Sequence, residues 1–277
     1  MNLLEQTKFI LKNYNLSINK LRGQNFLISD KILKDIIDVS DLKITDNVLE
    51  VGPGLGTLTN AILEKNVNLI SVELDANFIP ILEKIKLVSD NFNFIKSDIL
   101  KLNLNKELNS DFLKKYKIIS NIPYNITSRF LRIFLESDFA PHKMILMIQK
   151  EVAQRIVNYD KKWSKLSVMC NFYSEPKIEF YVSRNDFYPS PEVDSAVISF
   201  SNISKDRYRV DRKKFFQIVN IGFSSKRRTL LNNLKSGLNL DKKNIERAIS
   251  DCNLDLNIRA EKLNLDNWIK LCSILIK

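Results

Sequence analysis

Residues 121–124, Asn-Ile-Pro-Tyr, combine side chains that could act on an amine attached to an aromatic ring. Such an amine is a poor nucleophile because its lone pair is delocalised into the ring, and hydrogen-bond acceptors can localise that pair on nitrogen. The side-chain oxygen of Asn121 and the main-chain carbonyl of Ile122 are two such acceptors. Pro123 fixes the turn, and Tyr124 could stack on a base, a contact of about 1–3 kcal/mol. The alternative is an ordinary turn in which Tyr124 fills a core gap, since Asn and Pro are common turn formers.

A glycine-rich segment, VLEVGPGLGTLT at 48–59, could hold a nucleoside. Gly52 and Gly54 permit backbone angles and close approaches that other residues forbid. Glu73 could accept both hydroxyls of an adenosine ribose, and Asp98 could accept a hydrogen bond from the adenine amine. An acidic lining suits S-adenosylmethionine, which has cationic sulfonium and amino groups and no phosphate, whereas NAD or ATP would call for basic partners.

The glycine spacing alone is a weak signal. It reads G-x-G-x-x-T, whereas the dinucleotide fingerprint has Gly or Ala in the third position. The glycines could form a tight turn, and the two acids could be ordinary strand ends. The prediction of a cofactor site therefore depends on both acids lying at the ends of neighbouring strands.

The elements that would position these residues follow from hydrophobic periodicity. Short apolar runs rich in β-branched residues predict strands over 47–52, 68–74, 92–98, 117–121 and 144–149. Three- and four-residue apolar spacing predicts intervening helices over 58–65, 76–86 and 128–137. This alternation is typical of an α/β fold with a parallel sheet and crossover helices, which a hairpin of 177–183 and 194–200 would complete.

After Phe200 the pattern becomes helical. Amphipathic segments are expected over 211–223, 227–238, 242–252 and 265–276. Gly222 and Gly237 are the expected breakpoints, and Asp241 is an expected N-cap. We therefore divide the chain into an α/β domain, 1–203, and a small helical domain, 204–277.

The charge is concentrated in the last quarter of the chain. The whole sequence carries +11, and residues 201–277 hold 17 Lys and Arg against 8 Asp and Glu, a net of +9. A localised basic surface attracts polyanions, so RNA or DNA is the natural partner. A merely solvated face is the alternative, because basic runs are common on soluble surfaces.

Composition excludes several classes of protein. The single histidine, His142, leaves little scope for a Ser-His-Asp hydrolase or a two-His metal site. Cys170, Cys252 and Cys272 lack CxxC spacing, so we expect neither a zinc site nor a disulfide framework, and no metal. No leader peptide or eighteen-residue apolar run occurs, which predicts a soluble, cytoplasmic protein.

Motifs along almost the whole chain resemble the KsgA/RsmA-type rRNA adenine dimethyltransferases. They are GQNFL (23–27), EVGPGLGTLT (50–59), VELD (72–75), SD (97–98), NIPYNI (121–126), QKEVAQR (149–155), KLSVM (165–169), FYPSPEVDSAV (187–197), KRRTLLNNL (226–234) and RAEKL (259–263). Their order and spacing make the resemblance specific. It implies a Rossmann-like class I methyltransferase sheet with a helical RNA-binding domain.

The resemblance also implies roles for individual residues. Asn25 and Leu27 would close over S-adenosylmethionine, whose site Gly52, Glu73, Asp98 and Asn121 would also line. Asn121 and Tyr124 would hold the target base, with Phe187 as a second stacking surface. Lys226, Arg227 and Arg228 would contact RNA. The family product is dimethyladenosine at two adjacent adenosines in the 3′ hairpin of 16S rRNA, made within an immature small ribosomal subunit, and we expect a monomer.

Two positions depart from the family pattern: Arg22, where an apolar residue is common, and Leu231, where a basic residue is usual. The first bears on the packing of the N-terminal lid, and the second removes one possible phosphate contact. Neither lies in the expected cofactor or base pocket.

Three other functions remain open from the sequence. An Erm-type enzyme would modify large-subunit rRNA, and the VDSAV, RRTLLNNL and RAEKL segments argue against it. A binding protein could use the fold without catalysis, but it would not need an intact 121–124 motif. The basic C-terminal helices disfavour a small-molecule substrate, while RNA and DNA are not separated.

Overall fold

The computed structural model describes residues 1–19, 23–158 and 160–276. The chain forms two compact units, the first of Met1–Ala153 and Glu175–Ile203, and the second of Gln154–Ser174 and Ser204–Lys277. The sequence had placed residues 154–174 in the first domain, whereas their contacts place them in the second unit. No helix among the described residues is long and apolar enough to span a bilayer.

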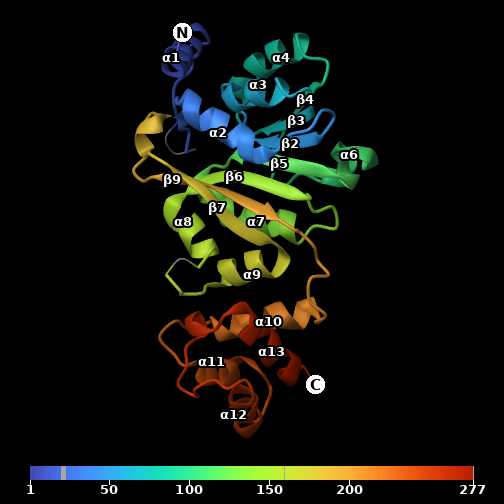
Figure 1. The fold of residues 1–277 in the computed structure, drawn as a ribbon, viewed down its shortest axis with the longest axis vertical. Helices are drawn as coiled ribbons and strands as arrows, with labels where there is room; N and C mark the ends of the chain where they lie inside the picture. The colour runs from blue at the N-terminus through green and yellow to red at the C-terminus, as the bar shows by residue number, and fades with distance from the viewer. Residues whose placement is uncertain (20–22, 159, 277) are drawn as a thin grey trace. The chain divides into compact units, whose positions relative to one another are not determined.

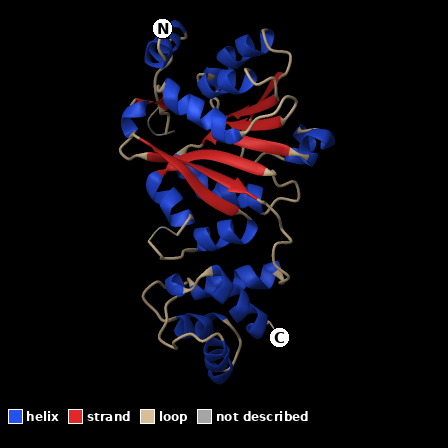
Figure 2. Ribbon diagram, viewed as in Figure 1, coloured by secondary structure: helices blue, strands red, loops and turns tan. Residues whose placement is uncertain are grey.

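The first unit is built on a seven-stranded sheet in the order β4-β3-β2-β5-β6-β9-β7 (Figures 1 and 2). The parallel strands are β2 (Asn47–Val51), β3 (Asn68–Glu73), β4 (Phe92–Lys96), β5 (Tyr116–Asn121) and β6 (Lys143–Gln149). The antiparallel pair is β7 (Glu175–Val182) and β9 (Ser195–Ser201). The predicted α/β class, the five strands and the closing hairpin are confirmed.

Helices cover the strands on both sides, as Figure 2 shows. They are α1 (Leu3–Asn13), α2 (Asp30–Ser40), α3 (Thr57–Leu63), α4 (Ile79–Leu87), α5 (Leu104–Glu107), α6 (Ser110–Lys114) and α7 (Thr127–Leu135), with short 3-10 turns at Ala76–Phe78, Tyr124–Ile126 and Arg184–Asp186. Helix α8 (Lys150–Ile156) begins in this unit, and its residues from Gln154 onward belong to the second. A two-stranded ribbon joins β1 (Phe26–Leu27) to β8 (Phe187–Tyr188).

Strand alternation divides the core into two layers. Val48, Ile119 and Ile145 belong to one buried cluster together with the apolar residues of α2, α3 and α4. Leu49 and Ile118, next to them in sequence, are fully buried but lie outside that cluster, because successive strand side chains face opposite sides of the sheet. The sheet is therefore buried on both faces, as parallel sheets usually are.

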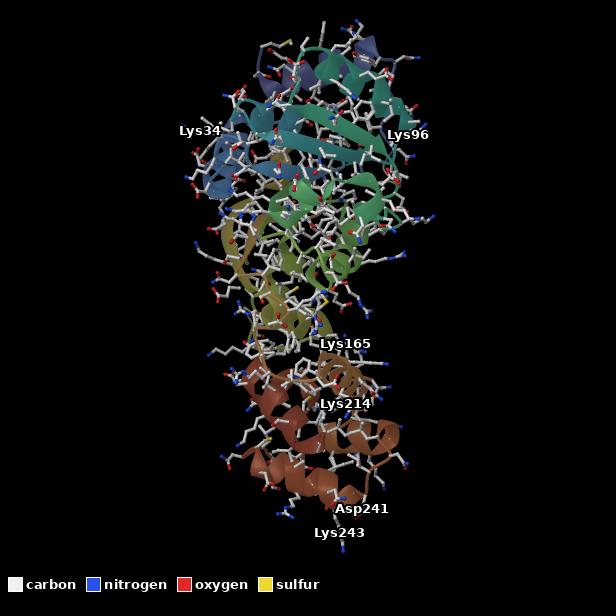
Figure 3. The ribbon with its side chains drawn as sticks, turned by 90° about the vertical axis from the view of Figure 1, so that its right-hand side faces the viewer. Lys34, Lys96, Lys165, Lys214, Asp241 and Lys243 are labelled. Carbon is white, nitrogen blue, oxygen red and sulfur yellow. The ribbon has the colours of Figure 1, made fainter. Side chains whose placement is uncertain are left out.

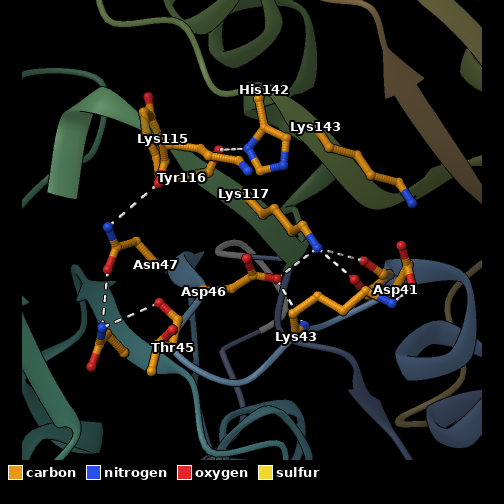
Figure 4. A network of polar contacts seen from close by, with 12 residues as sticks. Asp41, Lys43, Thr45, Asp46, Asn47, Lys115, Tyr116, Lys117, His142 and Lys143 are labelled. Carbon is orange, nitrogen blue, oxygen red and sulfur yellow. Dashed lines mark hydrogen bonds and ion pairs between the residues drawn. The ribbon is translucent and has the colours of Figure 1, made fainter.

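A buried ion pair lies at the amino-terminal ends of the central strands (Figure 4). Lys117 Nζ on β5 lies 2.7 Å from Asp46 Oδ2 and donates to the carbonyl of Asp41 at 2.6 Å. His142 Nδ1 lies 2.9 Å from the Tyr116 carbonyl at the same end of the sheet. This network ties the end of α2 to β2 and β5, and it leaves the single histidine in a structural setting.

The second unit is helical. Its helices are α9 (Lys165–Tyr173), α10 (Arg212–Gly222), α11 (Leu230–Gly237), α12 (Lys242–Asp251) and α13 (Leu265–Leu275), with a 3-10 turn at Ala260–Lys262. Gly222 and Gly237 are the last residues of their helices, and Asp241 is the N-cap of α12, as predicted. The three cysteines are buried free thiols in this unit.

Aromatic packing explains why the 154–174 segment joins the second unit. The Phe172 ring of α9 stacks on that of Phe215 of α10 with centroids 4.6 Å apart, and Tyr173 stacks on Phe216 at 5.4 Å. The amide of Trp163 also donates to the Glu261 carbonyl at 2.8 Å. Such aromatic pairs stabilise a core beyond their buried area.

Candidate active site

A cavity of about 260 Å³ lies at the carboxyl ends of the parallel strands. The chain runs from β2 outward to β3 and β4, then returns to β5 on the other side of β2. In open α/β sheets this reversal opens the crevice that takes ligands. The cavity is lined by all seven residues predicted for the cofactor: Asn25, Leu27, Gly52, Gly54, Glu73, Asp98 and Asn121.

The glycine loop closes one wall of this cavity. Gly52 and Gly54 have φ angles of +70° and +55°, which favour glycine. A Cβ atom on Gly54 would lie 3.3 Å from the Phe26 ring, which packs down from the segment preceding α2. The loop therefore offers bare backbone to the cavity, and Gly54 also lets Phe26 approach.

Glu73 is held rigidly at the end of β3. Its Oε2 accepts from the Gly54 amide at 3.1 Å, and its Oε1 accepts from the Asp75 amide at 2.6 Å. Burial, opposed by these hydrogen bonds, raises the pKa of the Glu73 carboxyl above its ordinary value. Each oxygen retains a further lone pair, so the group can still accept two hydroxyls from a ligand.

Asp98 lies on the same cavity two residues after β4. Its Oδ1 accepts from the Leu100 amide at 3.0 Å, and Oδ2 is 3.9 Å from Lys101 Nζ. Its side chain is 29% exposed, so it remains accessible to a ligand. Glu73 and Asp98 therefore line the same cavity, as their predicted places at the ends of neighbouring strands led us to expect.

A second buried acid, Glu50, also lines the cavity and was missed as a site residue in the sequence. It is 1% exposed, and its Oε2 accepts from the hydroxyls of Thr59 and Ser71, each at 2.8 Å. Burial raises the pKa of Glu50 to about 7, against these two hydrogen bonds and with help from the Glu73 charge. The available signal was a lone carboxylate inside an apolar strand, since such groups are rarely buried without a function.

The segment 121–124 forms the opposite wall. Asn121 Nδ2 donates to the Asn25 carbonyl at 3.4 Å, and no hydrogen bond to its Oδ1 occurs among the described residues. The Ile122 amide donates to the Met147 carbonyl of β6 at 3.2 Å. Tyr124 is half-buried, and its hydroxyl lies 2.6 Å from Ser195 Oγ. Burial raises the pKa of the Tyr124 phenol, which therefore stays neutral.

The segment before α2, which includes Gln24, Asn25 and Leu27 and which we call the N-terminal lid, is held at the cavity by a hydrogen bond and a strand pairing. Gln24 Nε2 donates to Asp75 Oδ2 at 2.8 Å, while the Asp75 amide holds Glu73. Leu27 pairs with Phe187 in the β1–β8 ribbon. No sequence pattern indicates the Gln24–Asp75 contact, which joins residues 51 positions apart. Arg22, the departure noted before this segment, lies outside the described residues.

Phe187 is not brought to the cavity. It is 3% exposed, belongs to the buried cluster and does not line the cavity wall. Its ring is covered in this structure, so a stacking role would require the ribbon to open. Tyr124 is the aromatic residue of the predicted base site that does reach the cavity.

The predicted RNA-contacting residues lie together in the second unit. Lys226, Arg227 and Arg228 are exposed in the turn between α10 and α11. Asn233 shapes this turn, since its Nδ2 donates to the carbonyls of Gly222 and Ser225 at 2.7 and 3.0 Å. Leu231, the second departure, is only 8% exposed and packs into the unit, where a basic side chain would have to be buried.

Basic side chains extend over more of this unit. Lys165 and Lys214 project from its surface, as does Lys243 (Figure 3). With 154–174 included, the unit holds 21 Lys and Arg against 9 Asp and Glu, a net of +12, and the first unit carries −1. The excess positive charge therefore lies entirely in the second unit.

A seven-stranded sheet that reverses between β2 and β5, with a glycine-lined acidic cavity there, defines the class I methyltransferase fold. The 23S rRNA methyltransferase ErmE shares this fold with a TM-score of 0.72 and 22% identity over 91% of this chain and 100% of that one. A dimethyladenosine transferase from Plasmodium falciparum has a TM-score of 0.74 and 23% identity, over 89% and 95% of the two chains. The chain belongs to the ribosomal RNA adenine dimethylase family, whose model matches residues 15–277.

Two curated relatives are more similar in sequence. Ribosomal RNA small subunit methyltransferase A of Dehalococcoides mccartyi (strain CBDB1) is 40% identical over 275 residues, covering 98% of this chain and 93% of the relative. The protein of the same name from Clostridium botulinum (strain Okra / Type B1) is 40% identical over 270 residues and 96% of each chain. Membership of this family confirms the resemblance and makes the chain a methyltransferase that uses S-adenosylmethionine.

Proposed function

We propose that the protein dimethylates N6 of two adjacent adenosines in the 3′-terminal hairpin of 16S rRNA. The observation that carries this proposal is the convergence of Asn121 and Tyr124 with Gly54, Glu73 and Asp98 on one cavity. Residues suited to a planar amine thus face residues suited to an adenosine cofactor. The name shared by the two relatives supports the small subunit as the source of the RNA.

The residues present fit S-adenosylmethionine. Glu73, fixed by two main-chain amides, would accept the ribose hydroxyls, and Asp98 would accept from the adenine amine. Glu50 would face the cationic part of the cofactor, because a buried carboxylate at this position favours a positive neighbour. Asn25 and Leu27 would cover the cofactor from the lid. When bound, the cofactor supplies an electrophilic methyl group on its sulfonium.

The protein's own contribution is to orient the amine and to localise its lone pair. The Nδ2–Asn25 hydrogen bond directs the Asn121 side chain so that Oδ1 remains available as an acceptor. An amine proton donated to Oδ1 and another to the Ile122 carbonyl would point the lone pair at the methyl group. Holding reacting atoms about 3–3.5 Å apart in line lowers the barrier by removing orientational freedom, and the proton is lost after alkylation without a strong base.

Tyr124 would hold the target base by stacking on its face. A base in a hairpin loop is already partly unstacked, so extruding it costs less than flipping one from a duplex. We retain Phe187 as a second stacking surface only as a proposal that requires the β1–β8 ribbon to open. Lys226, Arg227 and Arg228, with the field of the second unit, would hold RNA phosphates.

These roles imply a wider setting. The substrate would be an immature small ribosomal subunit in the cytoplasm, and the enzyme would act as a monomer. The basic second unit would bind the RNA, and the acidic cavity of the first unit would bind the cofactor. Both would be needed to methylate a base inside a folded RNA.

Methyl transfer from labelled S-adenosylmethionine tests the proposal directly. Undermethylated small ribosomal subunits and large-subunit rRNA are offered separately, and the modified nucleotides are mapped. We expect dimethyladenosine at two adjacent positions in the small-subunit 3′ hairpin. Label in large-subunit rRNA alone would instead indicate an Erm-type activity, and cofactor binding without transfer to either RNA would indicate a binding protein.

A further inference from the structure

The VDSAV segment contains a serine whose side chain reaches the cavity wall formed by residues 121–124. Ser195 opens β9 and is fully buried, and its Oγ lies 2.6 Å from the Tyr124 hydroxyl. The two residues are 71 positions apart. The proposed function uses Tyr124 but has so far given Ser195 no role.

Ser195 is a fixed point because its strand is held on both sides. In β9 it pairs with Gln149 of β6 and with Val182 of β7. Central strands have few soft degrees of freedom, and a serine side chain has one heavy-atom torsion. Its hydroxyl can therefore act as a fixed partner for a side chain that lies outside the sheet.

Tyr124 needs such a partner. It lies in a short 3-10 turn, Tyr124–Ile126, rather than in a regular element, and its ring borders an open cavity. The backbone of this wall is tied to β6 by the Ile122–Met147 hydrogen bond, which leaves the direction of the Tyr124 ring to its own side-chain torsions. A hydrogen bond at the phenolic oxygen, far from Cα, restrains the ring axis most effectively.

We propose that Ser195 is a positioning residue that holds the Tyr124 ring where the target adenine stacks. This inference rests on the proposed function, since it assumes that Tyr124 contacts the base. Ser195 itself touches neither the base nor the cofactor. Its effect should therefore be seen with RNA as the varied substrate and should pass through the Tyr124 hydroxyl.

The alternative is that Ser195 only satisfies a half-buried phenol and stabilises the fold. A double-mutant cycle separates the two roles. Ser195→Ala, Tyr124→Phe and the double variant are each assayed for kcat and KM with small ribosomal subunits, and for KM with S-adenosylmethionine. Thermal unfolding of each variant is recorded in parallel.

If Ser195 positions Tyr124, each single variant should lose about fivefold in kcat/KM for RNA, the factor expected for one neutral hydrogen bond. The double variant should lose no more than either single variant, because both changes break the same contact. The KM for S-adenosylmethionine should be unchanged. Ser195→Thr, which retains the hydroxyl, should restore most of the lost rate.

Ser199→Ala is a matched control on the same strand. Ser199 is 5% exposed and donates to Glu179 Oε1 at 2.6 Å, so its replacement also removes a buried hydroxyl contact. We expect it to change stability but not kcat/KM for RNA.

Three outcomes would overturn the inference while leaving the proposed function intact. They are an active wild type with unimpaired Ser195→Ala, multiplicative losses in the double variant, or a Ser195→Ala defect that Tyr124→Phe does not share. A wild type that transfers no methyl group to small subunits would overturn the proposed function and this inference together.

Discussion

The buried carboxyl of Glu50 should make cofactor affinity depend on pH. Its pKa is raised to about 7 mainly by burial, so near neutral pH the empty site carries this group partly protonated. A cationic cofactor favours the ionised form and lowers the pKa on binding. By linkage, the affinity for S-adenosylmethionine should therefore rise as pH rises toward 7 and level off above it.

The size of the effect follows from the two pKa values. If binding returned the pKa from about 7 to its ordinary 4.5, the dissociation constant would be about 20-fold larger at pH 5.5 than at pH 7.5, an upper limit. The stability of the protein without cofactor should change with pH in the opposite direction. Because the folded pKa exceeds the unfolded one, the stabilising contribution of Glu50 is complete below 4.5 and is lost as pH rises through about 7.

Isothermal titration between pH 5.5 and 7.5 measures the effect, with proton release read from buffers of different ionisation enthalpy. Glu50→Gln supplies the control, since it keeps the shape and can still accept from Thr59 or Ser71 but cannot titrate. Its affinity should be weaker at pH 7.5 and much less dependent on pH. Glu73 also has a raised pKa, so a full pH dependence retained in Glu50→Gln would assign the linkage to another group and exclude Glu50 as its source.

Three further changes test other parts of the structure. Asn121→Ala should lower single-turnover methyl transfer by on the order of 10²-fold while S-adenosylmethionine binding stays within about threefold, and an unchanged rate would remove its proposed role. Neutralising residues 226–228 should make the plot of log affinity for RNA against log salt less steep by about 2. An unaltered slope would exclude this turn from the interface. Gly222→Ala places a Cβ 2.4 Å from the Trp268 ring, so urea unfolding should show a loss of about 1–3 kcal/mol, and full stability would contradict this packing.

Much of the first unit was predictable because local patterns determine it. Buried strands of a parallel sheet read as continuous β-branched runs, so all five could be located before their partners were known. The carboxyl ends of parallel strands lie at the same end of the sheet, and Gly52, Glu73, Asp98 and Asn121 meet there. Gly52, Glu73 and Asp98 were thus predictable from their positions after these strands, whereas Asn25 and Leu27 were indicated only by the family resemblance.

Contacts between distant segments were not accessible in this way. The family resemblance implied a stacking role for Phe187, but this residue pairs with Leu27 and is buried. The Ser195–Tyr124 and Gln24–Asp75 hydrogen bonds likewise join segments that are distant in sequence and meet only in the folded chain. Periodicity reports which face of an element is apolar and says nothing of which partner covers it.

The division into units shows the same limit and has a functional consequence. Residues 154–174 lie between β6 and β7 in the chain, so chain order placed them in the α/β domain. The stacking of Phe172 on Phe215 instead joins them to the helices after 203, and their net charge of +3 goes with them. The first unit is then left slightly acidic, which suits a cationic cofactor, while all the excess positive charge lies where RNA phosphates would be bound. The packing of α9 on α10 therefore also adds the basic residues of 154–174 to the unit whose charge would attract RNA.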